Sequence, residues 1–405
     1  MTASIILLNI LGQDRIGLSN KLYSAIETFD VRILDIGQSV IHDQVSQGIM
    51  LQLPDDKKVK QQLIDKARSL DLSIRVRDIK PEEYDHWVTL QGLNRYTLTL
   101  LTREVTAEEI AKVTAVTAEQ GLNIHDISRL SGRLPIGLPV SNETKSCIEF
   151  TVQGTPKDPE VMRTSFLKIA GELDVDIAIQ QDNAYRRSRR LVCFDMDSTL
   201  IEAEVIDELA KRAGVGDQVA AITESAMQGK IDFTESFKQR MSLLKGVSES
   251  VLNEVAESLP IMEGAETLIR NLHAYGFKTA ILSGGFSYFG HFLQRKFGID
   301  YVHANTLEIV DGKLTGNVVH PVVDGQRKAL LLKEIAEQEG LDPQQVIAVG
   351  DGANDLPMLS VAGLGIAFRA KPLVRESAKQ SMSTHGLDGI LYLLGFKEQD
   401  ITRYS

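Results

Sequence analysis

The chain has 405 residues, 43% of them hydrophobic and 24% charged, with a formal net charge of −11 and a pI of about 5.3. This length allows two or three domains with a substantial core, and the acidic balance argues against non-specific binding to nucleic acid or to membrane surfaces. Two cysteines do not make a disulfide framework, and the apolar part of MTASIILLNILGQDR is too short to span a bilayer. We therefore expect a cytoplasmic protein.

Two segments in the first half of the chain repeat the same order of predicted elements. Ser4–Gln38 predicts strand, turn, helix and strand, and Arg95–Leu130 predicts the same order again. Apolar stripes mark both helices, made by Leu18, Leu22, Ile26 and Phe29 in the first and by Ile110, Val113 and Val116 in the second. Each copy continues with another strand, helix and strand, which completes the βαββαβ order of a ferredoxin-like fold. We expect two such domains, at residues 1–85 and 93–181.

The loop between the first strand and first helix bears on the function of these domains. In the first copy it reads GQDRIGL (Gly12–Leu18), and it resembles the same loop of ACT domains, modules that bind amino acids and regulate attached enzymes. The resemblance implies an amino-acid effector such as L-serine, held by loop amides and a helix N-terminus, and a homodimer formed through these domains. The second copy departs from the pattern with LTREV (Leu101–Val105). A purely structural role for the pair stays the alternative.

A basic segment separates this half from the rest of the chain. Residues 182–190 include RRSRR (Arg186–Arg190), which we interpret as a solvated linker rather than a nucleic-acid site. Beyond it, apolar runs predict strands at 191–194, 279–282, 346–349 and 364–368, alternating with helices, and a hairpin turning at Asp311-Gly312. This order predicts an α/β domain at residues 191–405 with a doubly wound parallel sheet.

Polar residues follow three of these predicted strands. Asp195, Asp197, Ser198 and Thr199 follow the first, Ser283, Gly284 and Gly285 the second, and Gly350–Asp355 the third. Because ligands of doubly wound sheets bind at the carboxyl ends of the strands, we expect these residues to lie together, with Lys328 from the start of a helix nearby.

The residue types at this edge combine acids with donors for an anion, which requires a cation between them. Asp195, Asp351 and a main-chain oxygen near Asp197 are hard oxygen ligands suited to Mg²⁺. Ser283, the Gly284 amide and Lys328 are donors for a phosphoryl group. The pattern therefore predicts a magnesium and phosphate site.

The ordered set DMDST (Asp195–Thr199), SGG (Ser283–Gly285), Lys328 and GDGAND (Gly350–Asp355) resembles the haloacid dehalogenase-like superfamily. The resemblance implies that Asp195 attacks phosphorus to form an aspartyl-phosphate, and that Asp197 is the general acid and base. It also implies that Asn354 and Asp355 orient the metal, the phosphate and Lys328 from a supporting position.

A helical insertion at about residues 203–260 is expected to cap this site. DSTLIEAE, AMQGKIDFTESFKQRMSLLKG and LSGGF resemble phosphoserine phosphatases within that superfamily. The resemblance implies that Glu204 binds the substrate ammonium, that Arg240 binds its carboxylate, and that Met227 and Phe233 form an apolar wall. Without the resemblance, Glu204 and Arg240 would be interpreted as surface charges of helices.

These features predict a magnesium-dependent enzyme that hydrolyses L-phosphoserine to L-serine and phosphate in the last step of serine biosynthesis. We expect no nucleic-acid and no membrane partner. The alternatives are a phosphatase for another small ester, a phosphotransferase that passes the group to an alcohol, and an amino-acid-binding regulator that only senses phosphoserine.

Overall fold

The computed structural model describes residues 4–54, 57–141, 143–227, 230–231 and 233–404. The chain forms two compact units, residues 1–93 and 94–405, and each is considered by itself. In the described residues, none of the helices has the length and apolar character needed to cross a membrane.

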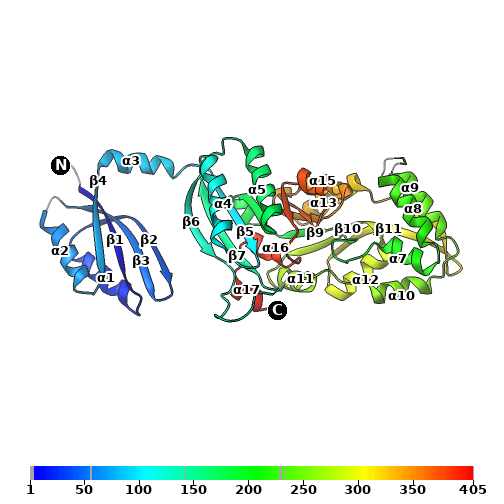
Figure 1. Ribbon diagram of the computed structural model, residues 1–405, viewed down its shortest axis with the longest axis horizontal. Coiled ribbons are helices and arrows are strands. Elements are labelled where there is room, and N and C mark those ends of the chain that lie inside the picture. Colours follow the sequence, from blue (N-terminus) through cyan, green and yellow to red (C-terminus); the bar gives the residue numbers. More distant parts are fainter. Residues whose placement is uncertain (1–3, 55–56, 142, 228–229, 232, 405) are drawn as a thin grey trace. The chain divides into compact units, whose positions relative to one another are not determined.

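The first unit contains one antiparallel sheet in the order β2-β3-β1-β4 (Figure 1). Its strands are β1 (Ser4–Gln13), β2 (Arg32–Ile41), β3 (Gln44–Leu53) and β4 (Ser73–Ile79), and its helices are α1 (Leu18–Glu27), α2 (Lys57–Arg68) and α3 (Pro81–Leu90). The stripe residues Leu18, Leu22 and Ile26 are buried in its core, whereas Phe29 lies beyond the end of α1 and is only partly buried.

The second unit begins with the same arrangement, a sheet in the order β6-β7-β5-β8. Its elements are β5 (Arg95–Thr102), α4 (Ala107–Glu119), β6 (Asn123–Arg129), β7 (Ser146–Gln153), α5 (Pro159–Leu173) and β8 (Asp176–Gln181). Helix α4 begins where Thr106 and Glu109 form a reciprocal capping box. The predicted βαββαβ order is therefore confirmed in both copies.

The rest of the second unit is built on a seven-stranded sheet in the order β12-β11-β10-β9-β13-β14-β15. Its strands are β9 (Leu191–Phe194), β10 (Lys278–Phe286), β11 (Tyr301–Val310), β12 (Lys313–Val319), β13 (Val346–Gly350), β14 (Leu364–Phe368) and β15 (Gln380–Met382). All neighbours are parallel except β11 and β12, which form the predicted hairpin. Asp311 and Gly312 both have positive φ there, as its tight turn requires.

Helices cover both faces of this sheet, as Figure 1 shows for α13 on one side and α11 and α12 on the other. Alternate residues of β9 divide between the two cores, with Leu191 and Cys193 on the α13 side and Val192 and Phe194 on the opposite side. The helices are α6 (Ala184–Arg187), α7 (Val205–Arg212), α8 (Gly216–Met227), α9 (Phe233–Leu243), α10 (Ser250–Ser258), α11 (Ala265–Ala274), α12 (Ser287–Phe297), α13 (Gly325–Gln338), α14 (Leu356–Val361), α15 (Pro372–Ser377), α16 (Gly389–Leu393) and α17 (Glu398–Thr402), with short 3₁₀ turns η1 (Pro343–Gln345) and η2 (Ala353–Asp355). The expected α/β fold class is confirmed.

The two sheets of the second unit are joined through β8 and β15. The side chain of Gln380 bonds both the amide and the carbonyl of Ile179, so it continues the hydrogen bonding of the β8 edge. The Asp176 carboxylate accepts hydrogen bonds from the amides of Ser383 and Thr384 and lies 3.1 Å from Nδ1 of the buried His385.

Two sequence expectations need correction in detail, the end of one strand and the exposure of the basic segment. Strand β10 continues to Phe286 rather than ending at 282, and the short strand β15 was not predicted. The basic segment is not a solvated linker throughout, because Arg189 is only 5% exposed and Arg186 forms an ion pair with Glu149. The predicted limit at residue 85 falls inside α3, and the domain limits stay predictions.

Candidate active site

The carboxyl ends of β9, β10 and β13 meet at one cavity of about 780 Å³. These three strands are adjacent and parallel, so the residues that follow them come together as expected. Eight of the predicted site residues line the cavity: Asp195, Asp197, Glu204, Arg240, Ser283, Gly284, Asp351 and Asn354. The other two, Lys328 and Asp355, lie directly behind Asp195.

Lys328 is completely buried between two carboxylates. Its Nζ donates to Oδ1 of Asp195 and to Oδ1 of Asp355, each at 2.7 Å. Burial alone would lower the pKa of Lys328, but the two carboxylates outweigh it and raise that pKa, so the ammonium stays charged. A permanent positive charge is thereby held against Asp195.

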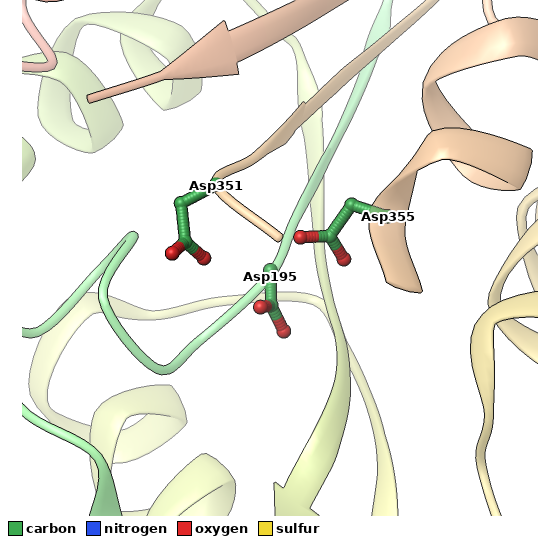
Figure 2. A group of neighbouring side chains, drawn as sticks. All are labelled: Asp195, Asp351 and Asp355. Atoms are coloured by element: carbon green, nitrogen blue, oxygen red, sulfur yellow. The ribbon is translucent and has the colours of Figure 1, made fainter. Parts of the chain in front are cut away.

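Asp195, Asp351 and Asp355 are neighbours at the carboxyl ends of β9 and β13, as Figure 2 shows. Each offers an oxygen atom, and these atoms lie within 4.8 Å of one another. Burial, followed by the charge of Asp195, raises the pKa of Asp351 to about 7 and that of Asp355 to about 6. One lysine is too little positive charge for three carboxylates, so this group fits a bound divalent cation with oxygen ligands.

The Asp197 side chain lies outside this acidic group. Its Oδ1 accepts a hydrogen bond from the amide of Val205 at 3.3 Å, which turns the carboxyl toward the cap. Burial and then the charges of Glu204 and Asp195 raise the pKa of Asp197 well above its ordinary value. A Cβ on Gly285 would lie 2.5 Å from Oδ2 of Asp197, so only glycine leaves room for this carboxyl.

The last residues of β10, where the register with β11 is irregular, present donors on the opposite side of Asp195. Ser283 is fully buried, and its Oγ accepts a hydrogen bond from the amide of Gly285 at 2.9 Å, which leaves its hydroxyl hydrogen to donate elsewhere. The side chain of Asn305 donates to the carbonyl of Gly284 and accepts from the amide of Val323, both at 2.8 Å. Asn305 was not predicted as a site residue, because it lies inside a strand with no motif around it.

The cap brings Glu204 and Arg240 to the same cavity, from the start of α7 and from α9. The Glu204 side chain is exposed to the cavity, but its burial among the cavity residues still raises the pKa of its carboxyl. Its Oε1 accepts a hydrogen bond from Ser198 at 3.0 Å. Burial lowers the pKa of Arg240, and its buried Nε has no hydrogen-bond partner among the described residues. The structure therefore brings these two charges into the site rather than leaving them on the outer surface.

Other cavity residues were not predicted. Phe237 of the cap and Phe286 at the end of β10 lie with ring centroids 6.4 Å apart and form an apolar part of the wall. Exposed Lys371 and Leu373 form part of its rim. No motif of the sequence pointed to them, since their place depends on how the cap folds over the sheet. The predicted wall residues Met227 and Phe233 have side chains outside the described part of the chain.

Comparison with protein families places this architecture in a known class. Residues 189–363 match the haloacid dehalogenase-like hydrolase family, and residues 4–77 and 95–180 each match ACT domains. The fold is thus that of a haloacid dehalogenase-like hydrolase that carries two ACT domains.

Whole-chain relatives narrow the class further. The chain is 38% identical over 396 residues to the phosphoserine phosphatase SerB2 of Mycobacterium tuberculosis, covering 98% of this chain and 94% of that one. It is also 38% identical over 403 residues to the phosphoserine phosphatase of Streptomyces coelicolor, covering 98% and 93%. The crystal structure of a probable phosphoserine phosphatase from Vibrio cholerae matches with a TM-score of 0.58 at 36% identity, covering 76% of this chain and 89% of that one. The chain belongs to the phosphoserine phosphatase family.

Proposed function

We propose that this chain hydrolyses L-phosphoserine to L-serine and phosphate. The observation that carries the proposal is the single cavity in which Asp195, paired with Lys328, faces two cap charges of opposite sign, Glu204 and Arg240. An amino-acid phosphate ester carries a phosphoryl group, an ammonium and a carboxylate, and this cavity offers a complementary group for each.

Recognition of the amino-acid part rests on the cap. Arg240 is enclosed and its Nε lacks a protein partner among the described residues, so a ligand carboxylate would compensate its charge. The Glu204 carboxylate, oriented by Ser198, would take the ammonium group. Ser283, Gly284 and Asn354 would contact the phosphoryl oxygens at the edge of the sheet.

We infer that Mg²⁺ is the cation of the acidic group. Asp195 and Asp351, with a main-chain oxygen of Asp197, would hold it, and Asp355 would orient these groups from behind. When bound, the ion would offset negative charge on the phosphoryl oxygens and so favour attack by a carboxylate.

The chain's own residues would carry the chemistry in two steps. First, a carboxylate oxygen of Asp195 forms a bond to phosphorus as the bond to the serine Oγ breaks, and Asp197 gives its proton to that oxygen. A raised pKa suits Asp197 to this task because the carboxyl keeps its proton to a higher pH than an ordinary aspartate does. Next, Asp197 takes a proton from water as the water oxygen attacks phosphorus, and the aspartyl-phosphate bond breaks. Lys328 holds Asp195 in position throughout.

The direct experiment measures phosphate release from L-phosphoserine by the purified full chain, with Mg²⁺ and with a chelator. We expect metal-dependent release, abolished in Asp195→Asn and retained in Asp217→Asn, whose exposed carboxyl lies on the cap outside the cavity. Release that persists in Asp195→Asn would contradict the nucleophile. Release from other esters but not from phosphoserine would contradict the substrate.

The assignment of Arg240 is tested by substrate comparison. Arg240→Ala should raise KM for phosphoserine at least tenfold more than KM for p-nitrophenyl phosphate, which has no carboxylate. Exposed Arg295→Ala, on α12, is the matched control. Equal losses with both substrates would exclude Arg240 as the carboxylate partner.

We also propose that the ACT domains serve regulation and assembly. The loop before α1 and its Gly17, with φ of 83°, would bind an effector such as L-serine. The β2 edge strand exposes Ile33, Ile36 and Ile41, which supports a homodimer formed through this domain. We also propose a cytoplasmic location and a role in the last step of serine biosynthesis, as expected from the sequence. The proposed domain limits stay 1–85, 93–181, 182–190 and 191–405.

A further inference from the structure

A second cavity lies at the amino ends of the strands of the seven-stranded sheet, whereas the candidate active site lies at their carboxyl ends. It has a volume of about 210 Å³ and is lined by the four arginines of the basic segment and by Tyr275, Phe277, Leu394 and Phe396. Arg190 immediately precedes β9 and Phe277 immediately precedes β10, whereas Asp195 and Asp197 follow β9 and Ser283 lies toward the carboxyl end of β10. This cavity is therefore separate from the candidate active site.

Two of its arginines are enclosed without enough hydrogen-bond acceptors. Arg189 is 5% exposed and donates from Nη1 to Oε1 of Gln180 at 2.6 Å, but its buried Nε has no partner in the part of the chain that the structure describes. The same is true of the buried Nε of Arg186, whose Nη2 pairs with Glu149 at 3.0 Å. These unpaired N–H groups show that the protein compensates the two guanidinium groups only in part.

The charges around the cavity do not balance. Among the described residues, Glu149 is the one carboxylate in an ion pair with these arginines, and it serves Arg186. Burial and the neighbouring Arg186 guanidinium lower the pKa of Arg189 to about 10, with no carboxylate opposing them. Arg190 lies over the ring of Phe277 at 5.6 Å, and Arg187 is exposed. Three guanidinium groups thus line a space with apolar walls, and Glu149, paired with Arg186, is the one carboxylate among the described residues that forms an ion pair with any of them.

We propose that this cavity binds a small doubly charged oxyanion of the phosphate class. Guanidinium groups hold such oxyanions through paired N–H donors, and Arg186, Arg189 and Arg190 would supply them. The volume is below that of a typical organic ligand pocket, so it suits an ion of this size rather than a nucleotide. The rings of Tyr275, Phe277 and Phe396 exclude water from one side and so strengthen the attraction.

Occupancy would connect distant parts of the second unit. Gln180, the partner of Arg189, lies in β8 and donates to the carbonyl of Leu393 at 2.9 Å. An anion held by Arg189 beside Leu394 and Phe396 would therefore connect the β6-β7-β5-β8 sheet to the C-terminal segment. Inorganic phosphate, which the proposed reaction releases, belongs to the class of ligand that this site would take.

The test uses phenylglyoxal, which modifies accessible arginines, on the full chain, with peptide mass spectrometry to measure each arginine separately. Exposed Arg187 and Arg190 report on the cavity, Arg240 reports on the active site, and exposed Arg295 is the internal control. We expect inorganic phosphate and sulfate to slow modification of Arg187 and Arg190 several-fold, and chloride at equal ionic strength to leave it unchanged. Arg295 should be unaffected by any of them.

Arg189→Gln supplies the decisive comparison, because it removes the enclosed charge and keeps both reporters. The phosphate concentration for half protection should rise about tenfold, which is the effect of losing one charge-assisted contact. If this variant does not fold by circular dichroism, Arg190→Gln, at an exposed position, replaces it, with Arg187 as reporter.

Equal protection in the variant, or no protection up to tens of millimolar phosphate, would overturn the proposal. Protection by an oligonucleotide but not by phosphate would also overturn it. Because Arg240 is measured separately, an altered active site gives a different pattern.

Discussion

At the scale of single residues, the acidic group links stability to pH. The folded chain raises the pKa of Asp351 to about 7, mainly by burial, so the folded state keeps a proton that the unfolded chain loses at about pH 4. In the absence of metal, the free energy of unfolding should therefore fall as the pH rises from about 4 to 7. At pH 8 we expect Asp351→Asn to be more stable than the unaltered chain by on the order of 2 kcal/mol, measured by urea unfolding in chelator.

Mg²⁺ provides the control for this prediction. It should stabilise the unaltered chain at pH 8 and have a much smaller effect on Asp351→Asn, because a ligand has been removed. Asp217→Asn should behave as the unaltered chain does. A variant that is less stable at pH 8, or that keeps the full response to Mg²⁺, would show that Asp351 is not under this electrostatic strain.

The proton of Asp197 makes a second prediction at this scale. With phosphoserine, Asp197→Asn should lower kcat by about 10²–10⁴-fold, because the serine oxygen needs a proton to leave. Nitrophenolate leaves without one, so p-nitrophenyl phosphate should give a burst of about one equivalent followed by slow turnover, measured by rapid mixing. A missing burst, with equal losses for both esters, would contradict the proposed role.

At the scale of elements, the end of β10 depends on a close approach between Gly285 and Asp197. A Cβ on Gly285 would lie 2.5 Å from the Asp197 carboxyl and 2.8 Å from Met196. We expect Gly285→Ala to lower kcat more than tenfold by moving Asp197, with a modest change in unfolding temperature. Gly171→Ala in α5, where a Cβ meets nothing within 4 Å, is the control. Unchanged activity in Gly285→Ala would show that the end of β10 shifts to make room for the methyl group.

The same scale shows which elements could be predicted from the sequence. Continuous apolar runs located β9 and β14 correctly, because parallel strands buried on both faces carry this pattern. Strand β15 has three residues, Gln380, Ser381 and Met382, and no such pattern. It exists because β14 beside it offers unpaired backbone groups and Gln380 bonds Ile179 of the ACT sheet.

At the scale of the whole molecule, residues 1–93 and 94–405 form separate compact units, and calorimetry should show two unfolding transitions. Asp176→Ala removes an acceptor shared by the amides of Ser383 and Thr384 and by His385. It should destabilise the second unit by about 3 kcal/mol and lower only that transition by several degrees. The first transition is the internal control, and a shift in both or in neither would contradict this division.

The sequence alone determined the repeated βαββαβ order, the α/β domain and the set of polar residues at the ends of β9, β10 and β13. It could do so because burial periodicity and short motifs are local properties of the chain. Only the tertiary structure decided that Lys328 joins Asp195 to Asp355. It also decided that Asn305 supports Gly284, and that Arg189 is enclosed at the amino ends of the strands. These contacts join residues distant in the chain, and their energies come from burial and charge pairing, which exist only once the sheet and its helices are packed.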